Sequence, residues 1–209
     1  MKKLAFTLAE VLLTLVIIGI IAAMTISPII QTTQKKQFVA GLLKANSTLS
    51  RATLMAKNDV GENELDSIWA DSTFGYNTLQ LYKKHLSIAK DCGSGTGCWP
   101  KEVLCLDGSV FWSDWDAYYA GRYGKAVLTD GSAIMFDGSY IYVDVNGSKA
   151  PNQLGRDIFQ FAYFSDKHHL LPLGTGYANL DLQCNTTTAA GKYAQSCPAK
   201  IIMEGEMNY

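Results

Sequence analysis

Residues 11–30 read VLLTLVIIGIIAAMTISPII and form the most apolar part of the chain. It belongs to a longer run, residues 11–34, in which 24 consecutive positions carry no charged side chain. Twenty residues in a helix rise about 30 Å, which is the thickness of the hydrocarbon core of a bilayer. The sequence therefore predicts a helix that spans a membrane close to the N-terminus.

Outside this segment, the composition of the chain is typical of a water-soluble protein. Of the 209 residues, 48% are hydrophobic and 18% are charged, and the formal net charge is -1. This balance argues against binding to nucleic acid or lipid head groups through bulk positive charge. The hydrophobic fraction is too high for wholesale disorder. We therefore expect a membrane-inserted segment attached to a water-soluble head.

An ordinary secretory signal peptide is the main alternative for the N-terminal segment. Lys2 and Lys3 provide the positive start of such a peptide, and small residues within 22–27 offer cleavage sites. The apolar stretch is longer than the roughly 7–15 residues of a typical signal-peptide core. Lys35 and Lys36 follow the span and balance the two lysines before it, so the positive-inside rule does not fix the orientation.

One acidic residue, Glu10, immediately precedes the apolar run and lies four residues before Thr14. A carboxylate within a membrane span costs roughly 2.5–3.5 kcal/mol at mid-depth and less near the interface. Two interpretations follow from the charge alone. Either the side chain lies at the level of the lipid head groups, or it forms an ion pair with a cationic group of a partner protein.

Residues 6–15, FTLAEVLLTL, resemble the N-terminal signature of type IV pilins and of the pseudopilins of type II secretion. In that family a short basic leader precedes a Phe, and an acid stands at the fifth position after the cleavage site. The resemblance implies a leader at residues 1–5, cleavage between Ala5 and Phe6, and Glu10 as the acid. It also implies a prepilin peptidase that cuts on the cytoplasmic side and methylates the new amine, while the apolar segment stays in the mature protein.

The resemblance covers about the first 30 residues and does not identify the head. The family usually has Gly before the cleavage site, where this chain has Ala5. In the family, the acid of one subunit meets the N-terminal amine of its neighbour in an apolar filament core. Opposite charges attract strongly there, and an unpaired charge is costly. The resemblance therefore implies that Glu10 is an assembly residue.

Beyond the span, the helix is expected to continue as an amphipathic segment over residues 31–57. Apolar residues recur there at steps of three or four, the spacing of one helix face. A continuous helix over residues 6–57 would be about 75 Å long, and a filament subunit needs such a rod whereas a lone globular domain does not. The predicted stripe consists of Phe38, Val39, Leu42, Leu43, Ala45, Leu49, Ala52 and Ala56.

The head, residues 58–209, is predicted to be an antiparallel sheet that packs on the amphipathic half of the helix. Asp-Gly pairs between apolar runs favour tight turns between strands. They predict a hairpin over residues 103–112 and a three-stranded meander over residues 125–145, whose last strand alternates as a half-buried strand does. Residues 158–164 are predicted to add a strand, and residues 79–88 to form a short helix or a loop followed by a helix. The fold class is therefore α+β, as the pilin resemblance also implies.

All five cysteines lie in the predicted head. Proximity in the sequence favours a Cys92–Cys98 and a Cys184–Cys197 disulfide, with Cys105 left as a buried thiol on a strand. A Cys92–Cys105 bridge is the chief competitor. Disulfides are typical of an oxidising compartment outside the cytoplasm. The sequence has no Cys-x-x-Cys pair, which argues against a structural zinc site.

Three further patterns have both a structural and a functional interpretation. Asp144, Asn146 and Asp157 could offer oxygens to Ca²⁺, but their loop lacks the EF-hand pattern, so a turn-rich connection is favoured and no metal site is predicted. The aromatic residues within 111–119 are interpreted as core and subunit contact rather than as a sugar-binding patch. The two histidines at 168–169 are interpreted as part of a surface turn rather than as metal ligands.

The predicted function is that of a structural subunit of a type IV pilus-like filament or of a type II secretion pseudopilus. The resemblance implies the following partners: identical or related pilin subunits, a prepilin peptidase, a membrane platform protein, an assembly ATPase and the lipid bilayer. No nucleic acid, cofactor or catalytic residue is predicted. The expected location is the cytoplasmic membrane, with one span and the head outside the cytoplasm, and then an extracellular or periplasmic filament. The alternative is a permanently anchored single-pass protein whose extracytoplasmic head binds a ligand.

Overall fold

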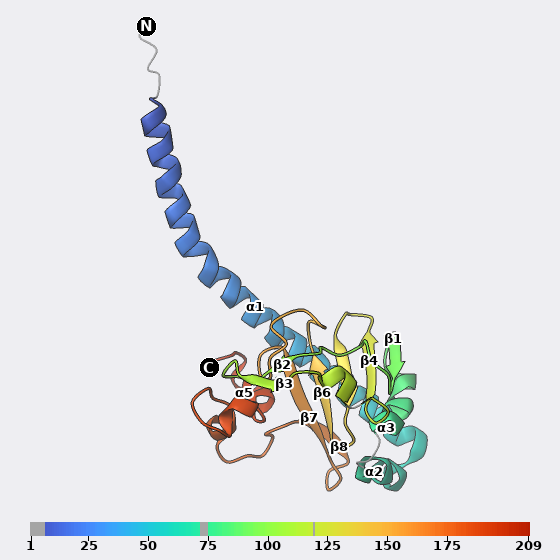
Figure 1. Cartoon of the computed structure of the whole chain (residues 1–209). Coiled ribbons are helices and arrows are strands. Elements are labelled where there is room, and N and C mark those ends of the chain that lie inside the picture. Colours follow the sequence, from blue (N-terminus) through green and yellow to red (C-terminus); the bar gives the residue numbers. More distant parts are fainter. Residues whose placement is uncertain (1–6, 72–74, 119) are drawn as a thin grey trace. The chain divides into compact units, whose positions relative to one another are not determined.

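The computed structural model describes residues 7–71, 75–118 and 120–209. The chain divides into two compact units, residues 1–37 and residues 38–209. One continuous helix of 53 residues, α1 (Leu8–Val60), contributes to both units (Figure 1). A helix of this length measures about 80 Å, so the long helix expected from the sequence is confirmed.

The first unit is built on the N-terminal part of α1. Every large apolar side chain described between Leu8 and Ile30 is exposed. Apolar surface of this extent is unfavourable in water and indicates a membrane or protein partner. The helix is long and apolar enough to cross a membrane.

Six strands in the second unit form one antiparallel sheet, in the spatial order β1-β4-β5-β6-β7-β8. They are β1 (Ile88–Gly93), β4 (Gly124–Leu128), β5 (Ala133–Phe136), β6 (Tyr140–Asp144), β7 (Ile158–Phe164) and β8 (His169–Pro172). A separate two-stranded sheet pairs β2 (Val103–Leu104) with β3 (Val110–Trp112). The predicted hairpin, meander and additional strand are therefore confirmed, whereas β1 and β8 were not expected.

The three predicted Asp-Gly turns share one construction. Asp107, Asp130 and Asp137 each accept a hydrogen bond through Oδ1 from the backbone N–H of the Ser two residues later, at 2.9, 3.0 and 2.9 Å. The intervening glycines have φ values of 84°, 88° and 99°. Side chains oppose this left-handed conformation, which glycine adopts readily. The turns thus set the connections of the hairpin and the meander.

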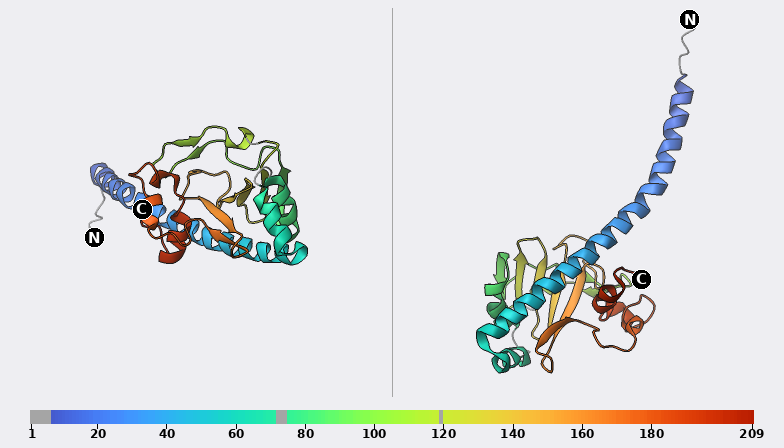
Figure 2. Two further views of the ribbon diagram at one scale, coloured as in Figure 1. Left: turned by 90° about the horizontal axis from the view of Figure 1, so that it is seen from below. Right: turned by 180° about the vertical axis from the view of Figure 1, so that it is seen from behind.

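The part of α1 beyond residue 37 lies across one face of the six-stranded sheet, as the right view of Figure 2 shows. The helix approaches the sheet closely at Gly41, where an added Cβ would lie 2.8 Å from Val145 Cβ. Leu43 was predicted to belong to the apolar stripe that faces the head, but it is 45% exposed. The buried face of the helix is therefore narrower than predicted. The buried apolar residues of the helix are Phe38, Val39, Leu42, Leu49, Ala52 and Ala56, and they share a core with Ile134, Phe136, Ile141, Val143, Phe159 and Phe161.

A second layer covers the opposite face of the sheet. In β6, Ile141 and Val143 belong to the core beneath α1, whereas Tyr142 belongs to a second cluster with Trp115 and Leu154. The expectation that this strand is half-buried is therefore wrong. Both of its faces are covered, because the β2–β3 sheet, the short helix α4 (Trp115–Tyr118) and the C-terminal segment supply the second layer.

Short helices complete the head. After α1 come α2 (Glu62–Ala70), α3 (Gly75–Tyr82) and the 3₁₀ turn η1 (Lys83–His85). The end of α3 and η1 account for the helix predicted within residues 79–88, whereas Ile88 begins β1. The C-terminal segment has two further 3₁₀ turns, η2 (Leu180–Gln183) and η3 (Gly191–Tyr193), and ends in α5 (Cys197–Glu204).

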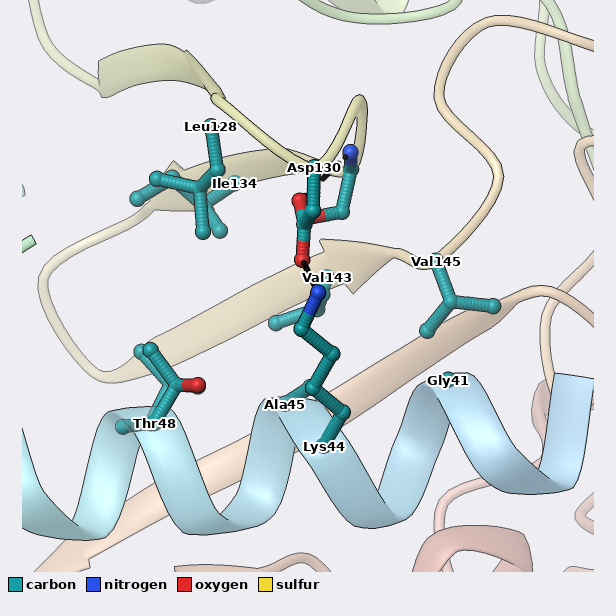
Figure 3. Close-up of a pocket in the computed structure, with 11 residues that line it drawn as sticks. Gly41, Lys44, Ala45, Thr48, Leu128, Asp130, Ile134, Val143 and Val145 are labelled. Carbon is teal, nitrogen blue, oxygen red and sulfur yellow. Dashed lines mark hydrogen bonds and ion pairs between the residues drawn. The ribbon is translucent and has the colours of Figure 1, made fainter. Parts of the chain in front are cut away.

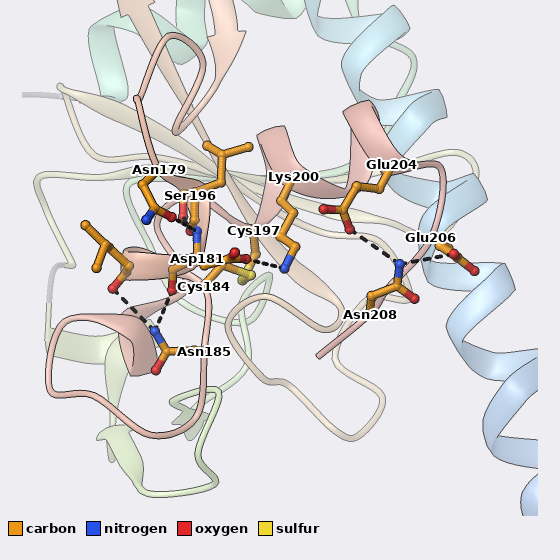
Figure 4. A network of polar contacts seen from close by, with 12 residues as sticks. Asn179, Asp181, Cys184, Asn185, Ser196, Cys197, Lys200, Glu204, Glu206 and Asn208 are labelled. Atoms are coloured by element: carbon orange, nitrogen blue, oxygen red, sulfur yellow. Dashed lines mark hydrogen bonds and ion pairs between the residues drawn. A yellow bond between two sulfur atoms is a disulfide. The ribbon is translucent and has the colours of Figure 1, made fainter.

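The C-terminal segment is held by polar contacts rather than by hydrogen bonds between paired strands (Figure 4). Lys200 Nζ lies 2.5 Å from Asp181 Oδ1. The side-chain amide of Asn185 donates to the carbonyl of Asp181 at 2.6 Å. A disulfide between Cys184 and Cys197 joins the same region.

Candidate functional site

The N-terminal end of α1 carries the acid that the sequence singled out. The backbone N–H and the hydroxyl of Thr7 both donate to Glu10 Oε2, each at 2.8 Å. In return, the backbone N–H of Glu10 donates to Thr7 Oγ1 at 3.2 Å. This is the capping box of a helix N-terminus, in which a Thr and a Glu three residues later satisfy each other's free N–H groups. Glu10 thus has a partner within its own chain.

The capping box was not predicted from the sequence, although Thr7 and Glu10 form the Thr-x-x-Glu pattern that is typical of it. It gives Glu10 a structural role in the single chain that is separate from any role in assembly. The two predicted processing residues, Ala5 and Phe6, lie outside the described residues. Cleavage between them stays a prediction from the resemblance.

The cysteines pair as proximity in the sequence suggested. Disulfides join Cys92 to Cys98 and Cys184 to Cys197, with Cα atoms 6.0 and 4.9 Å apart. Cys105 is free and buried. It follows β2 rather than lying on a strand, because β2 ends at residue 104. Both bridges lie in the second unit, where they close short loops.

A buried ion pair supports the loop of the first disulfide. Lys125 of β4 is fully buried, and its Nζ lies 3.1 Å from Asp116 Oδ1. The same ammonium group donates to the backbone carbonyl of Asp116. Asp116 Oδ2 accepts the backbone N–H of Gly97 at 2.5 Å, within the loop that the disulfide closes. No local pattern in the sequence indicates this pair, because its members belong to different elements.

The loop of residues 144–157 brings together the three side chains for which Ca²⁺ binding was weighed. Asp144 and Asp157 are wholly buried, and Asn146 donates its backbone N–H to Asp144 Oδ1 at 3.2 Å. Positive φ values at Gly147 and at Asn152, 68° and 49°, confirm the predicted turn-rich connection. Within residues 7–71, 75–118 and 120–209, no three His, Cys, Asp or Glu side chains gather as a metal cluster.

The aromatic residues within 111–119 divide between core and surface. Trp115 is buried, with its ring centroid 4.8 Å from that of Tyr142. The ring centroids of Trp112 and Tyr118 are also 4.8 Å apart, but Tyr118 is 65% exposed. Tyr119 lies outside the described residues. The predicted core role therefore holds for Trp115, and the predicted subunit contact stays untested.

The two adjacent histidines lie at the turn between β7 and β8. His168 has a φ of 48°, and its Nδ1 lies 3.1 Å from Asp66 Oδ2 of α2. His169 begins β8. Asp66 also accepts a hydrogen bond from the hydroxyl of Tyr163 at 2.6 Å. This cluster holds α2 against the β7–β8 connection, in keeping with a turn rather than a metal site.

A cavity of about 110 Å³ lies between α1 and strands β4 to β6 (Figure 3). Lys44 of α1 reaches Asp130 at 2.8 Å beside it. Aliphatic side chains such as Leu128, Ile134 and Val143 supply most of the remaining lining. Pockets that hold drug-sized ligands measure roughly 300–1,000 Å³. This cavity is therefore too small to indicate a site of that kind.

No family model matches the chain, and no curated protein or solved structure matches it either.

Proposed function

We propose that the chain is a structural subunit of a type IV pilus-like filament or of a type II secretion pseudopilus. The observation that supports this most is the division of α1 along its length. Its apolar side chains between Leu8 and Ile30 are exposed, whereas Leu42, Leu49 and Ala52 are buried against the head. An exposed apolar helix needs either lipid or other protein around it. The helix of a filament subunit is surrounded first by lipid in the membrane and then by other subunits in the filament.

In this proposal the chain is made as a precursor and enters the cytoplasmic membrane through residues 6–30. A prepilin peptidase removes residues 1–5 and methylates the amine of Phe6. A membrane platform protein and an assembly ATPase then extract the subunit into a helical filament. The head lies outside the cytoplasm, an oxidising setting in which disulfides persist. The subunit's own role is architectural.

The surface of α1 in the second unit supplies further support. Leu43 is 45% exposed and Leu54 is 53% exposed. The two are eleven residues apart, about three helical turns, and so share one face of the helix. Exposed apolar residues on one helix face are typical of a helix that packs against another chain. We infer that this face contacts neighbouring subunits in the filament.

Intact-mass analysis tests the proposal. The full-length chain is produced with and without a prepilin peptidase, and the membrane fraction is analysed. We expect a mature chain that begins at a methylated Phe6 only when the peptidase is present. The Ala5→Gly variant, which restores the residue usual in the family, serves as a matched control and should be processed at least as completely.

Two outcomes would overturn the proposal. Retention of residues 1–5 in both wild type and the Ala5→Gly variant would favour a permanently anchored protein with a ligand-binding head. Loss of the whole apolar segment would instead identify an ordinary signal peptide.

A further inference from the structure

An open depression with positive charge lies between α1 and the 3₁₀ turn η1. It measures about 240 Å³ and is lined by Arg51, Met55, Lys84, His85, Leu86 and Ser87. Arg51 and Lys84 are exposed, and neither side chain forms an ion pair or a hydrogen bond within the described part of the chain. No acidic residue is among those that line the depression. Two of its cations therefore lack a counter-charge.

The carboxylates that follow Arg51 in the chain have other partners. Glu62 Oε1 lies 3.0 Å from Lys57 Nζ. Asp59 Oδ2 lies 3.0 Å from His85 Nε2, so this acid faces the one lining side chain that is not a permanent cation. The charge of the two free cations thus remains available to an acidic group of another molecule.

Apolar surface adjoins these cations. Met55 is 44% exposed, and Leu54 beside it on α1 is 53% exposed. Exposed apolar side chains next to unpaired charges are typical of protein contact surfaces, in which an apolar centre is surrounded by polar groups. The depression therefore suits an acidic segment that also carries an exposed apolar side chain.

The end of α5 is a segment of this kind. Met203 is 77% exposed, and Glu204 and Glu206 follow it closely. The side-chain amide of Asn208 donates to Glu206 Oε1 at 3.0 Å and to Glu204 Oε2 at 3.5 Å (Figure 4). Neither carboxylate forms an ion pair with the residues that the structure describes. Residues 203–206 thus present two free carboxylates beside one apolar side chain.

The two surfaces lie at opposite sides of one head and do not meet within it. Leu86 and Ser87 directly precede β1, whereas α5 contacts β7. Strands β4, β5 and β6 separate β1 from β7, and four steps between strands amount to about 19 Å. Figure 1 shows β1 and the C-terminus on opposite sides of the head. A second copy of the chain can therefore supply the missing partner.

We propose that residues 203–206 of one copy dock into the depression between α1 and η1 of the next copy. Glu204 and Glu206 then face Arg51 and Lys84, and Met203 packs against Met55. Met side chains adapt readily to irregular apolar surfaces. A contact between two different surfaces of identical chains does not close a dimer but continues into an open helical array. The inference rests on the proposed filament function and assigns a contact to it.

Disulfide cross-linking tests the contact on the full-length chain in detergent and in membranes of cells with the assembly machinery. The Met55→Cys/Met203→Cys variant is oxidised with copper phenanthroline and air. We expect a ladder of trimers and longer species, because each chain has two different cross-linking surfaces. Either single variant should stop at dimers. The native thiol, Cys105, is buried.

The matched control places the first cysteine elsewhere on the exposed side of α1. Leu43 is 45% exposed and lies twelve residues, or about 18 Å, before Met55. The Leu43→Cys/Met203→Cys variant should give at least about tenfold less ladder, because a disulfide requires Cα atoms within about 7 Å.

Charge reversal in the double-cysteine background tests the complementarity. Arg51→Glu/Lys84→Glu and Glu204→Lys/Glu206→Lys should each lower the ladder at least about tenfold, because each places like charges in contact. All four reversals in one chain should restore it. Wild-type charges should give less ladder at about 0.5 M salt than at 0.05 M salt. The restored variant also shows that the reversals leave the head folded.

The contact is wrong if the ladder is no stronger than that of the Leu43→Cys control, or if the reversals leave it unchanged. It is also wrong if Met55→Cys cross-links to a different protein and never to Met203→Cys. The mass of the mature chain is measured on the same membranes. Processed chains without a ladder contradict this contact alone, whereas unprocessed chains that give a ladder contradict the proposed filament function alone.

Discussion

Thr7 and Glu10 hydrogen-bond to each other in both directions at the first turn of α1, with two contacts of 2.8 Å and one of 3.2 Å. A carboxylate held in this way has a partner before any second subunit arrives. In a filament, the N-terminal amine of a neighbour would take its place beside Glu10. The charge of Glu10 and its capping role are therefore separable by substitution, because glutamine preserves the cap without the charge.

The buried pair of Lys125 and Asp116 should be essential for the stability of the head. We expect Lys125→Met to lower the free energy of unfolding by about 3–5 kcal/mol, because it leaves the Asp116 carboxylate buried without a counter-charge. Urea denaturation of the full chain in detergent, followed by tryptophan fluorescence, measures this. All four tryptophans lie beyond residue 58, so the signal reports on the head alone.

Lys44→Met is the matched control for that substitution. Lys44 pairs with Asp130 at 2.8 Å, but its side chain is 61% exposed. Exposed ion pairs contribute little, so its loss should change the free energy of unfolding by less than about 1 kcal/mol. Equal effects of the two variants would show that burial of Lys125 is not what makes its pair important.

The two disulfides should stabilise the head unequally. Their cysteines are 6 and 13 residues apart. Loop-closure entropy then assigns about 2 kcal/mol to Cys92–Cys98 and about 3 kcal/mol to Cys184–Cys197. Paired Cys→Ala variants, compared by urea denaturation, measure both values, with Cys105→Ala as a single-thiol control. A larger loss on removal of the shorter bridge would contradict the entropic explanation.

The head should lose stability as pH rises from 5 to 9. Burial raises the pKa of Asp144 to about 9 and that of Asp157 to about 6, from an ordinary 3.8. Because the folded-state values lie above the unfolded value, their contribution is fully present below about pH 4 and is lost as pH rises through 6 and then 9. Urea midpoints should therefore fall across this range.

Burial also raises the pKa of Asp137 to about 6, so this carboxyl group adds to the fall. Carboxyl groups whose pKa is lowered do not produce it. A hydrogen bond from Tyr163 lowers the pKa of Asp66, and hydrogen bonds from Ser109 lower that of Asp107. Such groups are ionised above pH 5 in the folded and the unfolded chain alike, so they do not alter stability there. Asp144→Asn should remove much of the dependence. A stability that is flat from pH 5 to 9 in wild type would count against a buried acid in this loop.

Patterns local in the sequence predicted most of the fold. The charge-free run and the three- and four-residue spacing predicted α1, and the Asp-Gly pairs predicted the hairpin and meander. The edge strands β1 and β8 were missed because their sequences, IAKDCG and HLLP, lack alternation and include residues that disfavour strands. The second layer over β6 was missed because its covering residues come from distant parts of the chain.

The candidate site residues likewise fall into those that a local sequence pattern indicates and those that only the fold brings together. Proximity in the sequence predicted both disulfides, and a four-residue pattern contained the Thr7–Glu10 cap. Burial of Lys125 depends on Asp116 in another element and has no local signal. The polar side chains of residues 144–157 are visible in the sequence, but only the fold shows that three of their buried oxygens lack hydrogen-bond partners within the described residues.

Incorporation of Glu10 variants into filaments is the decisive test of the proposed assembly role. Wild type, Glu10→Gln and Glu10→Val are each produced in cells that supply the complete assembly machinery, and sheared surface fractions are examined by electron microscopy and immunoblotting. We expect that all three insert into the membrane, that wild type forms filaments, and that neither variant does, although glutamine preserves the helix cap. Filaments of Glu10→Gln as abundant as those of wild type would contradict it.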